Sequence, residues 1–470
     1  MLGVRLVEPR LAHAQEPSPP PTEAPAPSEP PPEVLPAPPP EPPPTEASTS
    51  ADAPESTGTQ EAAGGWGDLS AFEEEAEEST PVFRAKLYGF IDSYWEKTGR
   101  TPESIGDDGK TEYEKNPYEF DVLNLHVMVQ GALYDKYRFF VNLAAPGSGS
   151  PTEDSFVQVR NAWVEAPIWG RYLNARVGKT YRRFGLYNEI LDAVPTFIGI
   201  EPPEIFDRDH LMLTRTTNLM LHGSVDAGPG VFNYSLTTGN DERKSGAVPV
   251  GGDLNLEFPI GLKFGSSFYF SGGGATPSRA VGDGSPIGGV VNWMRQDTYR
   301  VLGGYAQLRN SGWILQAEYW RGHHDARRDA DAVATLLADG SLFPSQARRF
   351  VVDGDAAMIR TKVVYDIDAF YFRGAYEFSL GKLASLTPYV QYDYYRNPET
   401  VKAKSLGGDN EAGASEDGQF SKYTLGGVFR PVPQVALKVD SSVHNYKFNG
   451  EHVFYPEIRA SFSYLWELAQ

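Results

Sequence analysis

The sequence predicts an all-β fold: a transmembrane antiparallel β-barrel of about sixteen strands, preceded by a disordered Pro-rich arm. Three observations lead to this prediction. From residue 81 onward, apolar and polar residues alternate with a period of two. The connections between these alternating segments are short and long in turn. Aromatic residues make up 12% of the chain and recur near the predicted strand ends, where barrel proteins place the aromatic belts that contact the membrane interface.

The first 80 residues have a different composition. Residues 9–54 contain eighteen of the 38 prolines, and residues 1–80 carry sixteen acidic residues against two arginines. Such a sequence favours extended polyproline II and cannot bury a core. We therefore predict a disordered Pro/Glu-rich arm over residues 15–80 and the barrel over residues 81–470. The stretch from Trp66 to Thr80, which includes five glutamates between Glu73 and Glu78, is interpreted as a solvated acidic linker, with a short helix docked at the inner mouth of the barrel as the alternative.

The extreme N-terminus contains a pattern typical of protein export. Ala12-His13-Ala14 resembles a signal-peptidase site, although the preceding residues lack the usual apolar region. The interpretation is that residues 1–14 are the remnant of a signal peptide, and a chance match is the alternative.

The barrel prediction starts from residues 83–95. Odd positions there are mainly apolar, and the other face includes Arg84, Lys86 and Asp92. A period of two is the signature of a strand with two different faces. The pattern recurs along the chain, and we place strands starting near residues 83, 119, 136, 155, 171, 212, 230, 252, 261, 298, 312, 367, 386, 420, 435 and 454.

The connections separate a membrane barrel from a soluble β-sandwich. Short connections such as 134–136 and 309–312 alternate with long ones such as 180–211 and 322–366. Outer-membrane barrels have short periplasmic turns and long external loops, whereas a sandwich does not require this alternation. An even number of strands places both termini, and therefore the arm, in the periplasm. The aromatic residues assigned to the interfacial belts are Trp95, Tyr134, Trp169, Tyr172, Trp320 and Tyr395.

Composition excludes several other classes. The chain has no cysteine and therefore no disulfide or thiolate chemistry. No run of 18 apolar residues is present, so a membrane-spanning helix is not expected. The net charge of −20 resides mostly in the arm, and no basic patch indicates a nucleic-acid partner.

Two polar clusters are candidates for catalysis and for metal binding. Asp207-Arg208-Asp209-His210 could belong to an Asp–His hydrolase, but a polar loop is the simpler interpretation. His323-His324-Asp325 could bind a metal. Adjacent strand residues point to opposite faces, so solvated loop residues are preferred there. We predict no enzyme activity, no metal and no cofactor.

Two segments resemble a known family. Residues 87–95, LYGFIDSYW, look like the opening strand of bacterial porins, and so does the stretch from Val177-Gly178-Lys179 to Phe184-Gly185. From residue 81 the chain is similar to the sixteen-stranded general and phosphate-selective porin superfamily. The family's terminal aromatic residue is absent, because the chain ends in Gln470. The resemblance implies a channel in the bacterial outer membrane, surrounded by its lipid, with a homotrimeric assembly and a third long loop folded into the pore.

The third long loop here supplies the predicted pore constriction, which comprises Arg182, Arg183, Glu189, Asp192, Glu201, Glu204, Asp207, Arg208 and Asp209. Six of these nine residues are acidic, so a mild preference for cations is expected. Ten further charged residues are predicted to face the lumen: Lys86, Asp92, Arg138, Arg176, Glu318, Arg373, Glu377, Lys438, Asp440 and Arg459. Their mixed signs do not support a dedicated phosphate ladder.

The function that follows is passive diffusion of small hydrophilic solutes or ions, because sixteen strands enclose a lumen wide enough for water. Two alternatives stay open. One is a structural barrel anchored through its Pro-rich arm to a periplasmic partner. The other is a hydrolase with its site in the barrel loops.

Overall fold

The computed structural model describes residues 82–105, 110–114, 116, 118–146, 157–190, 194–204, 216–239, 248–271, 293–338, 342–399 and 415–468. The signal-peptide remnant and the arm predicted for residues 1–80 lie outside these ranges, as do Asp192 and the cluster from Asp207 to His210.

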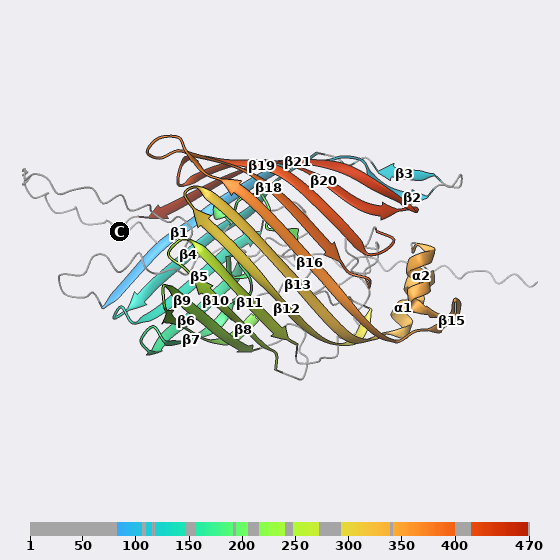
Figure 1. The fold of residues 1–470 in the computed structure, drawn as a ribbon, viewed down its shortest axis with the longest axis horizontal. Helices are drawn as coiled ribbons and strands as arrows, with labels where there is room; N and C mark the ends of the chain where they lie inside the picture. The colour runs from blue at the N-terminus through green and yellow to red at the C-terminus, as the bar shows by residue number, and fades with distance from the viewer. Residues whose placement is uncertain are drawn as a thin grey trace, which may run out of the picture. The chain divides into compact units, whose positions relative to one another are not determined.

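The described residues form one closed antiparallel wall of sixteen strands, in which β16 and β17 are two parts of one strand interrupted at Glu377 (Figure 1). The strands are β1 (Phe83–Thr98), β4 (Tyr118–Leu133), β5 (Tyr137–Pro146), β6 (Gln158–Trp169), β7 (Leu173–Thr180), β8 (Thr216–Ala227), β9 (Gly230–Gly239), β10 (Val250–Glu257), β11 (Leu262–Phe270), β12 (Met294–Asn310), β13 (Trp313–Arg328), β16 (Lys362–Tyr376), β17 (Phe378–Ser379), β18 (Ser385–Arg396), β19 (Gln419–Val432), β20 (Val435–Phe448) and β21 (Glu451–Leu468). Each of the sixteen predicted starts lies within five residues of an observed one, so the strand prediction is confirmed.

Pairing of the first and last strands closes the wall. β1 and β21 are antiparallel and in register from the Leu87–Leu468 pair to the Thr98–Glu457 pair. Closure is what a membrane requires, because backbone groups without hydrogen-bond partners are costly in hydrocarbon. The period of two in the sequence gives every strand two different faces, and closure turns one of them outward and the other inward.

The two faces differ as predicted. On the outward face, Leu125 and Phe372 are 41% and 42% exposed, and most of the exposed large side chains on these strands are apolar. On the inward face, Phe90, Asp92 and Arg373 are fully buried. An apolar outer surface of this kind suits contact with lipid.

Short turns join the strands at the end of the barrel where the described chain begins and ends. The turns at Tyr134-Asp135 and Ser311-Gly312 use positive φ angles, as tight hairpins do. Most connections at the opposite end are long, but the last one is not. Asn449-Gly450 joins β20 to β21 with φ of 53° and 80°, because Asn-Gly suits a type I′ turn. The predicted alternation of short and long connections is therefore wrong for this final pair.

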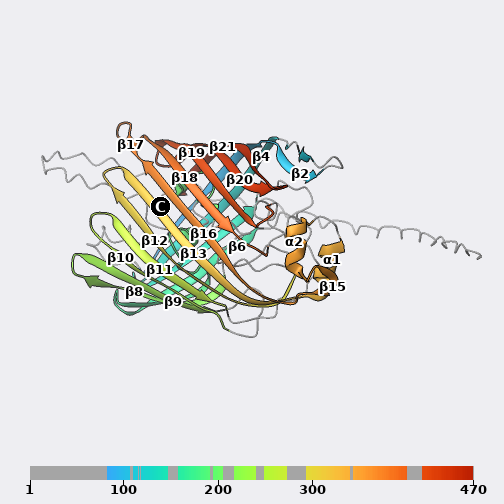
Figure 2. The ribbon, with the colours of Figure 1, turned by 45° about the vertical axis from the view of Figure 1, so that its right-hand side comes forward.

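Several small elements lie at the long-loop end. The first long connection contains the hairpin of β2 (Thr101–Ile105) and β3 (Thr111–Glu114). The connection from β13 to β16 contains helices α1 (Ala330–Ala338) and α2 (Pro344–Phe350) and the small sheet of β14 (Val351–Val352) and β15 (Asp355–Ile359). Figures 1 and 2 both place α1 and α2 beyond the ends of the wall strands. None of the described helices is long and apolar enough to cross a membrane.

Two of the predicted belt aromatics face inward instead. Trp320 and Tyr395 have no solvent exposure, because their positions on β13 and β18 share the inward parity of Glu318 and Asp393. Tyr134 and Trp169, by contrast, are 61% and 70% exposed at short turns.

The pair His323-His324 lies on β13 and not in a solvated loop as predicted. His323 faces outward and contacts Asp366 at 2.7 Å. His324 is buried between the rings of Tyr299 and Tyr365, with ring centroids 5.1 and 4.5 Å away. The strand is longer than expected, so the two rings point to opposite faces of the wall.

A charge on the outward face should destabilise the barrel. Phe372 pairs with Ala317 and Tyr392 in the middle of the wall, so we expect Phe372→Arg to lower the free energy of unfolding by about 2–4 kcal/mol. A folding titration into lipid vesicles would measure this change. Phe372→Met is the control, since it keeps the site apolar, and an equal loss in both variants would mean that Phe372 does not face lipid.

Candidate functional site

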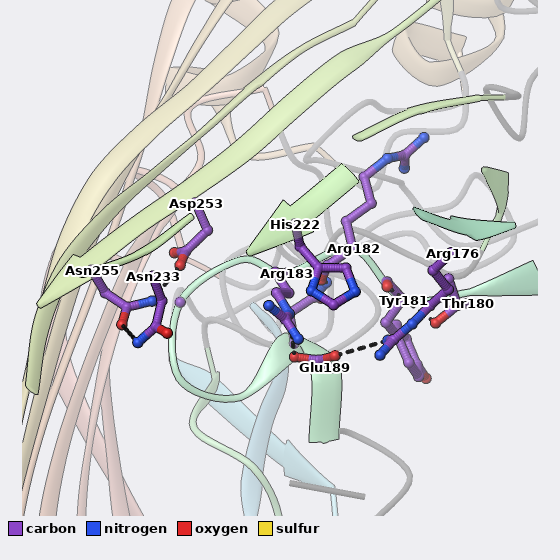
Figure 3. Close-up of polar contacts among 12 residues, drawn as sticks. Arg176, Thr180, Tyr181, Arg182, Arg183, Glu189, His222, Asn233, Asp253 and Asn255 are labelled. Carbon is purple, nitrogen blue, oxygen red and sulfur yellow. Dashed lines mark hydrogen bonds and ion pairs between the residues drawn. The ribbon is translucent and has the colours of Figure 1, made fainter. Parts of the chain in front are cut away.

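The candidate site is the third long connection, which runs from β7 to β8 and includes the 3-10 turns η2 (Asn188–Ile190) and η3 (Val194–Thr196). Its first part stays close to β7. Arg176 of β7 contacts Glu189 at 3.1 Å, and Arg183 contacts the other oxygen of the same carboxylate at 3.2 Å (Figure 3). Arg176 also bonds Glu165 of β6 at 2.8 Å. The loop therefore begins with a carboxylate held between two guanidinium groups.

The electrostatics of Glu189 follow from this geometry. Burial would raise the pKa of its carboxyl, but Arg183 and Arg176 more than offset burial and lower the pKa to about 2. Burial acts against the charge of Arg183 too, yet Glu189 holds the pKa of that guanidinium above its ordinary value. The pair is ionised at neutral pH.

The loop next reaches the opposite side of the lumen. β7 and β13 are six positions apart in the ring of sixteen strands, so they lie nearly opposite one another. The ring of Phe184 packs on Trp320 of β13 with centroids 4.3 Å apart. The backbone N–H of Leu186 donates to Glu318 Oε1 at 3.1 Å. These contacts carry the chain across the barrel interior.

Tyr187 extends this contact to β16. Its hydroxyl donates to Gln316 Oε1 at 3.0 Å and accepts from Arg373. Its ring stands edge-on to Tyr371, with centroids 5.9 Å apart. Tyr187 is 3% exposed, so this anchor is shielded from water.

The second half of the loop follows the wall from β18 to β21. Lys438 of β20 donates to the carbonyl oxygen of Gly199 at 3.0 Å. The N–H of Ile200 donates to Asp440 Oδ2 at 3.2 Å. Gly199 has φ of 101°, a conformation that glycine adopts readily. The wall thus binds loop backbone through charged side chains of both signs.

Two acidic loop residues end in a cluster of charges on the wall. Glu204 pairs with Lys422 of β19, and Glu201 pairs with Arg459 of β21 and lies 3.7 Å from Lys422. Glu457 lies 2.6 Å from Arg459. The side chain of Glu201 is 46% exposed while that of Glu204 is only 7% exposed. Glu201 is therefore the member of the pair that faces solvent.

The structure divides the predicted constriction residues into two groups. Arg183 and Glu189 lie together beside β7. Arg182 is buried over the ring of Tyr269 of β11, 5.0 Å from its centroid. Glu201 and Glu204 lie against β19 and β21. Within the described ranges these residues do not form a single ring. The remaining four, Asp192, Asp207, Arg208 and Asp209, lie outside the described residues.

Six of the ten residues predicted to face the lumen hold the loop through a contact given above: Arg176, Glu318, Arg373, Lys438, Asp440 and Arg459. The others do not touch its described part in the same way. Lys86 pairs with Glu467 at 2.8 Å, and Asp92 accepts from Ser463. Arg138 lies 3.9 Å from Glu165, and Glu377 is exposed between β16 and β17.

The sequence did not single out Tyr187 or Lys422. The only available signal for Lys422 was inward parity on β19. Nothing in the local sequence of Tyr187 indicates a partner that is 129 residues away. In the described part of the chain, no group of three metal-ligating side chains of the His, Cys, Asp and Glu types comes together.

Comparison with known structures concerns the fold. The outer membrane channel DcaP of Acinetobacter baumannii superimposes with a TM-score of 0.50 at 10% identity, covering 83% of this chain and 99% of that one. The chain has the fold of an outer-membrane porin. An anion-selective porin from Comamonas acidovorans gives a TM-score of 0.47 at 11% identity, over 82% of this chain and 100% of that one.

Salmonella typhi OmpF in complex with daunomycin gives a TM-score of 0.44 at 14% identity, over 82% of this chain and 98% of that one. No protein-family profile matches the sequence. No curated protein matches it significantly. The porin fold is therefore recognised from structure, at identities too low for sequence comparison.

The ion pairs of Glu189 should resist acid. Its pKa is about 2 in the folded protein, below the ordinary value, so its pairs stabilise the loop above about pH 4.5 and are lost only as the pH falls through about 2. We expect the protection of residues 183–190 from hydrogen exchange to be only slightly lower at pH 4 than at pH 7, since the stabilisation declines gradually between about pH 4.5 and pH 2. Glu189→Gln should lower this protection at both pH values.

Glu451→Gln is the matched control, because Glu451 is exposed beside the β20–β21 turn. A wild-type loop that lost its protection near pH 4.5 would contradict the assignment.

Proposed function

We propose that the protein is a channel of the bacterial outer membrane through which small hydrophilic solutes or ions diffuse passively. The observation that carries this proposal is a closed sixteen-strand wall that is apolar outside and charged inside. Barrels of eight strands are filled by their own side chains, whereas sixteen to eighteen strands leave an aqueous channel. The short-turn end would face the periplasm, together with residues 15–80, as in other outer-membrane barrels.

The loop between β7 and β8 is the proposed constriction. It crosses the lumen and is held beside β7 by Arg176, and on the far side of the wall by Glu318, Lys438 and Asp440. A loop held at several points narrows the passage without closing and opening as a lid. Its solvent-facing charge, Glu201, would favour cations passing at close range.

Other functions have less support. A barrel hydrolase needs an assembled catalytic group, and Asp207 to His210, the segment that suggested one, lies outside the described residues. A purely anchoring barrel would not need a charged inward face. The homotrimer and a periplasmic partner of the arm remain predictions.

The first test is conductance of the purified protein in a planar bilayer. We expect discrete steps that rise in proportion to salt concentration, as for a water-filled passage. Shortening residues 186–204 should raise the step size, since it removes the chain that crosses the lumen. Absence of steps from correctly folded protein would reject the channel, and an unchanged step size in the shortened variant would place the constriction elsewhere.

The second test is ion preference, measured as the reversal potential across a salt gradient. Glu201→Gln removes a solvent-facing negative charge and leaves Arg459 with less compensation. We therefore expect the preference for cations to fall. Glu451→Gln should not change the reversal potential, because Glu451 lies at an exposed turn. An identical reversal potential in wild type and Glu201→Gln would show that passing ions do not sense Glu201.

A further inference from the structure

The wall contains a notch at the long-loop end. β16 pairs with β13 along its whole length, up to the Arg327–Lys362 pair. On its other side it pairs with β18 only as far as Asp368–Arg396. Residues 362–367 therefore have no described strand beside them on that side. A cavity of about 390 Å³ lies there, bounded by this edge, by α2 and by Pro398-Glu399. Its volume falls within the range of small-molecule sites.

Arginine dominates the lining of this notch. Five arginines and two carboxylates contribute to it: Arg321, Arg328, Arg349, Arg360, Arg396, Asp366 and Glu399. Both carboxylates already have partners. Arg328 forms a two-point pair with Glu399, with Nε–Oε2 at 3.0 Å, and Arg321 lies 2.5 Å from Asp366. The positive charge of the other three arginines is left in excess.

Arg349 gives the strongest indication that the notch binds a ligand. One of its nitrogens donates to the carbonyl oxygen of Pro398. Its Nε and Nη2 are buried and have no hydrogen-bond partner, and within the described ranges no other residue has two such atoms. Burial lowers the pKa of this guanidinium and outweighs the opposing effect of Glu399, which raises it, while Arg328 lowers it by less than Glu399 raises it. An anion in the notch would supply the missing acceptors.

The other two arginines, Arg360 and Arg396, have weaker ionic contacts with the described residues. Arg360 is exposed and forms no ion pair with a described residue. Arg396 is 48% exposed, and its Nη1 lies 3.9 Å from Oδ2 of Asp368. Guanidinium groups match the oxygens of phosphate through paired N–H donors. We propose that this notch binds a phosphate group through Arg349, Arg360 and Arg396.

The level of the notch on the wall suggests two sources for the phosphate. Outward residues of β13 are apolar or aromatic from Trp313 to Tyr319, and Arg321 is the next one. The eight steps along the strand from Trp313 to Arg321 rise roughly 20 Å at the usual strand tilt, near the upper edge of an apolar band about 25 Å tall. The phosphate is therefore either free in solution or part of a lipid headgroup. The lipid source also rests on the proposed membrane location.

Binding can be measured by calorimetry on the full chain in a non-ionic detergent. The probes are inorganic phosphate and dihexanoyl phosphatidic acid, with dihexanoyl phosphatidylcholine as the lipid without a phosphomonoester. We expect Arg349→Gln to weaken binding at least tenfold. Arg348→Gln is the matched control, because Arg348 is the neighbouring arginine on α2, is exposed and does not line the notch.

The calorimetric results distinguish free phosphate from a lipid headgroup as the ligand. Binding of inorganic phosphate that depends on Arg349 supports a site for free phosphate. Binding of phosphatidic acid alone, with the same dependence, supports a lipid site. Arg360→Gln is a second test variant that is expected to fold, since the exposed side chain of Arg360 can be replaced without loss of a described ion pair. This variant should also weaken phosphate binding. Absence of binding by both phosphate probes, or equal effects of Arg348→Gln and Arg349→Gln, would overturn the proposal. Conductance does not enter this test, so its failure is distinguishable from failure of the proposed channel.

Discussion

Hydrogen bonds between β1 and β21 turn the sheet into a ring, and the properties of both faces depend on this closure. A free strand edge in hydrocarbon would expose backbone groups at several kcal/mol each. Once the ring is closed, parity along each strand decides whether a side chain meets lipid or the interior. Polar residues of inward parity can then find partners only in one another, in water or in chain that enters the lumen. The loop between β7 and β8 supplies many of those partners.

The wall holds the loop between β7 and β8 through charged side chains, although apolar contacts could also stabilise the loop. Glu318 and Asp440 each accept an N–H of the loop, and Lys438 donates to a loop carbonyl. The backbone of a loop needs such partners wherever it leaves water. Buried charges add little net stability over well-packed apolar groups, but removing one partner is costly, because it leaves the other charge uncompensated. These contacts therefore fix the position of the loop more than they increase the stability of the barrel.

Alternation of period two was enough to place all sixteen strands, because each strand needs only its own sequence to define two faces. It did not reveal which aromatic residues belong to the interface. Trp320 lies near the end of a predicted strand, but its parity points it inward onto Phe184. Local sequence patterns also could not predict the path of the loop between β7 and β8. Leu186 and Glu318 are 132 residues apart, and only the closed ring brings them together. For the same reason local patterns did not reveal that the described constriction residues lie in two separate groups, one beside β7 and one against β19 and β21.

The notch beside β16 follows from the same principle of closure. Where β16 extends beyond its pairing with β18, the wall has an edge, and edges that are not paired must be covered or charged. Here the edge is charged, since five arginines, including Arg349 of α2, line the cavity beside it. Charge alone would protect the edge without further partners. Yet protection does not explain why Nε and Nη2 of Arg349 are buried without an acceptor, because an arginine that only repelled other strands would keep these donors in water. A burial of this kind is consistent with a site whose acceptor comes from outside the chain.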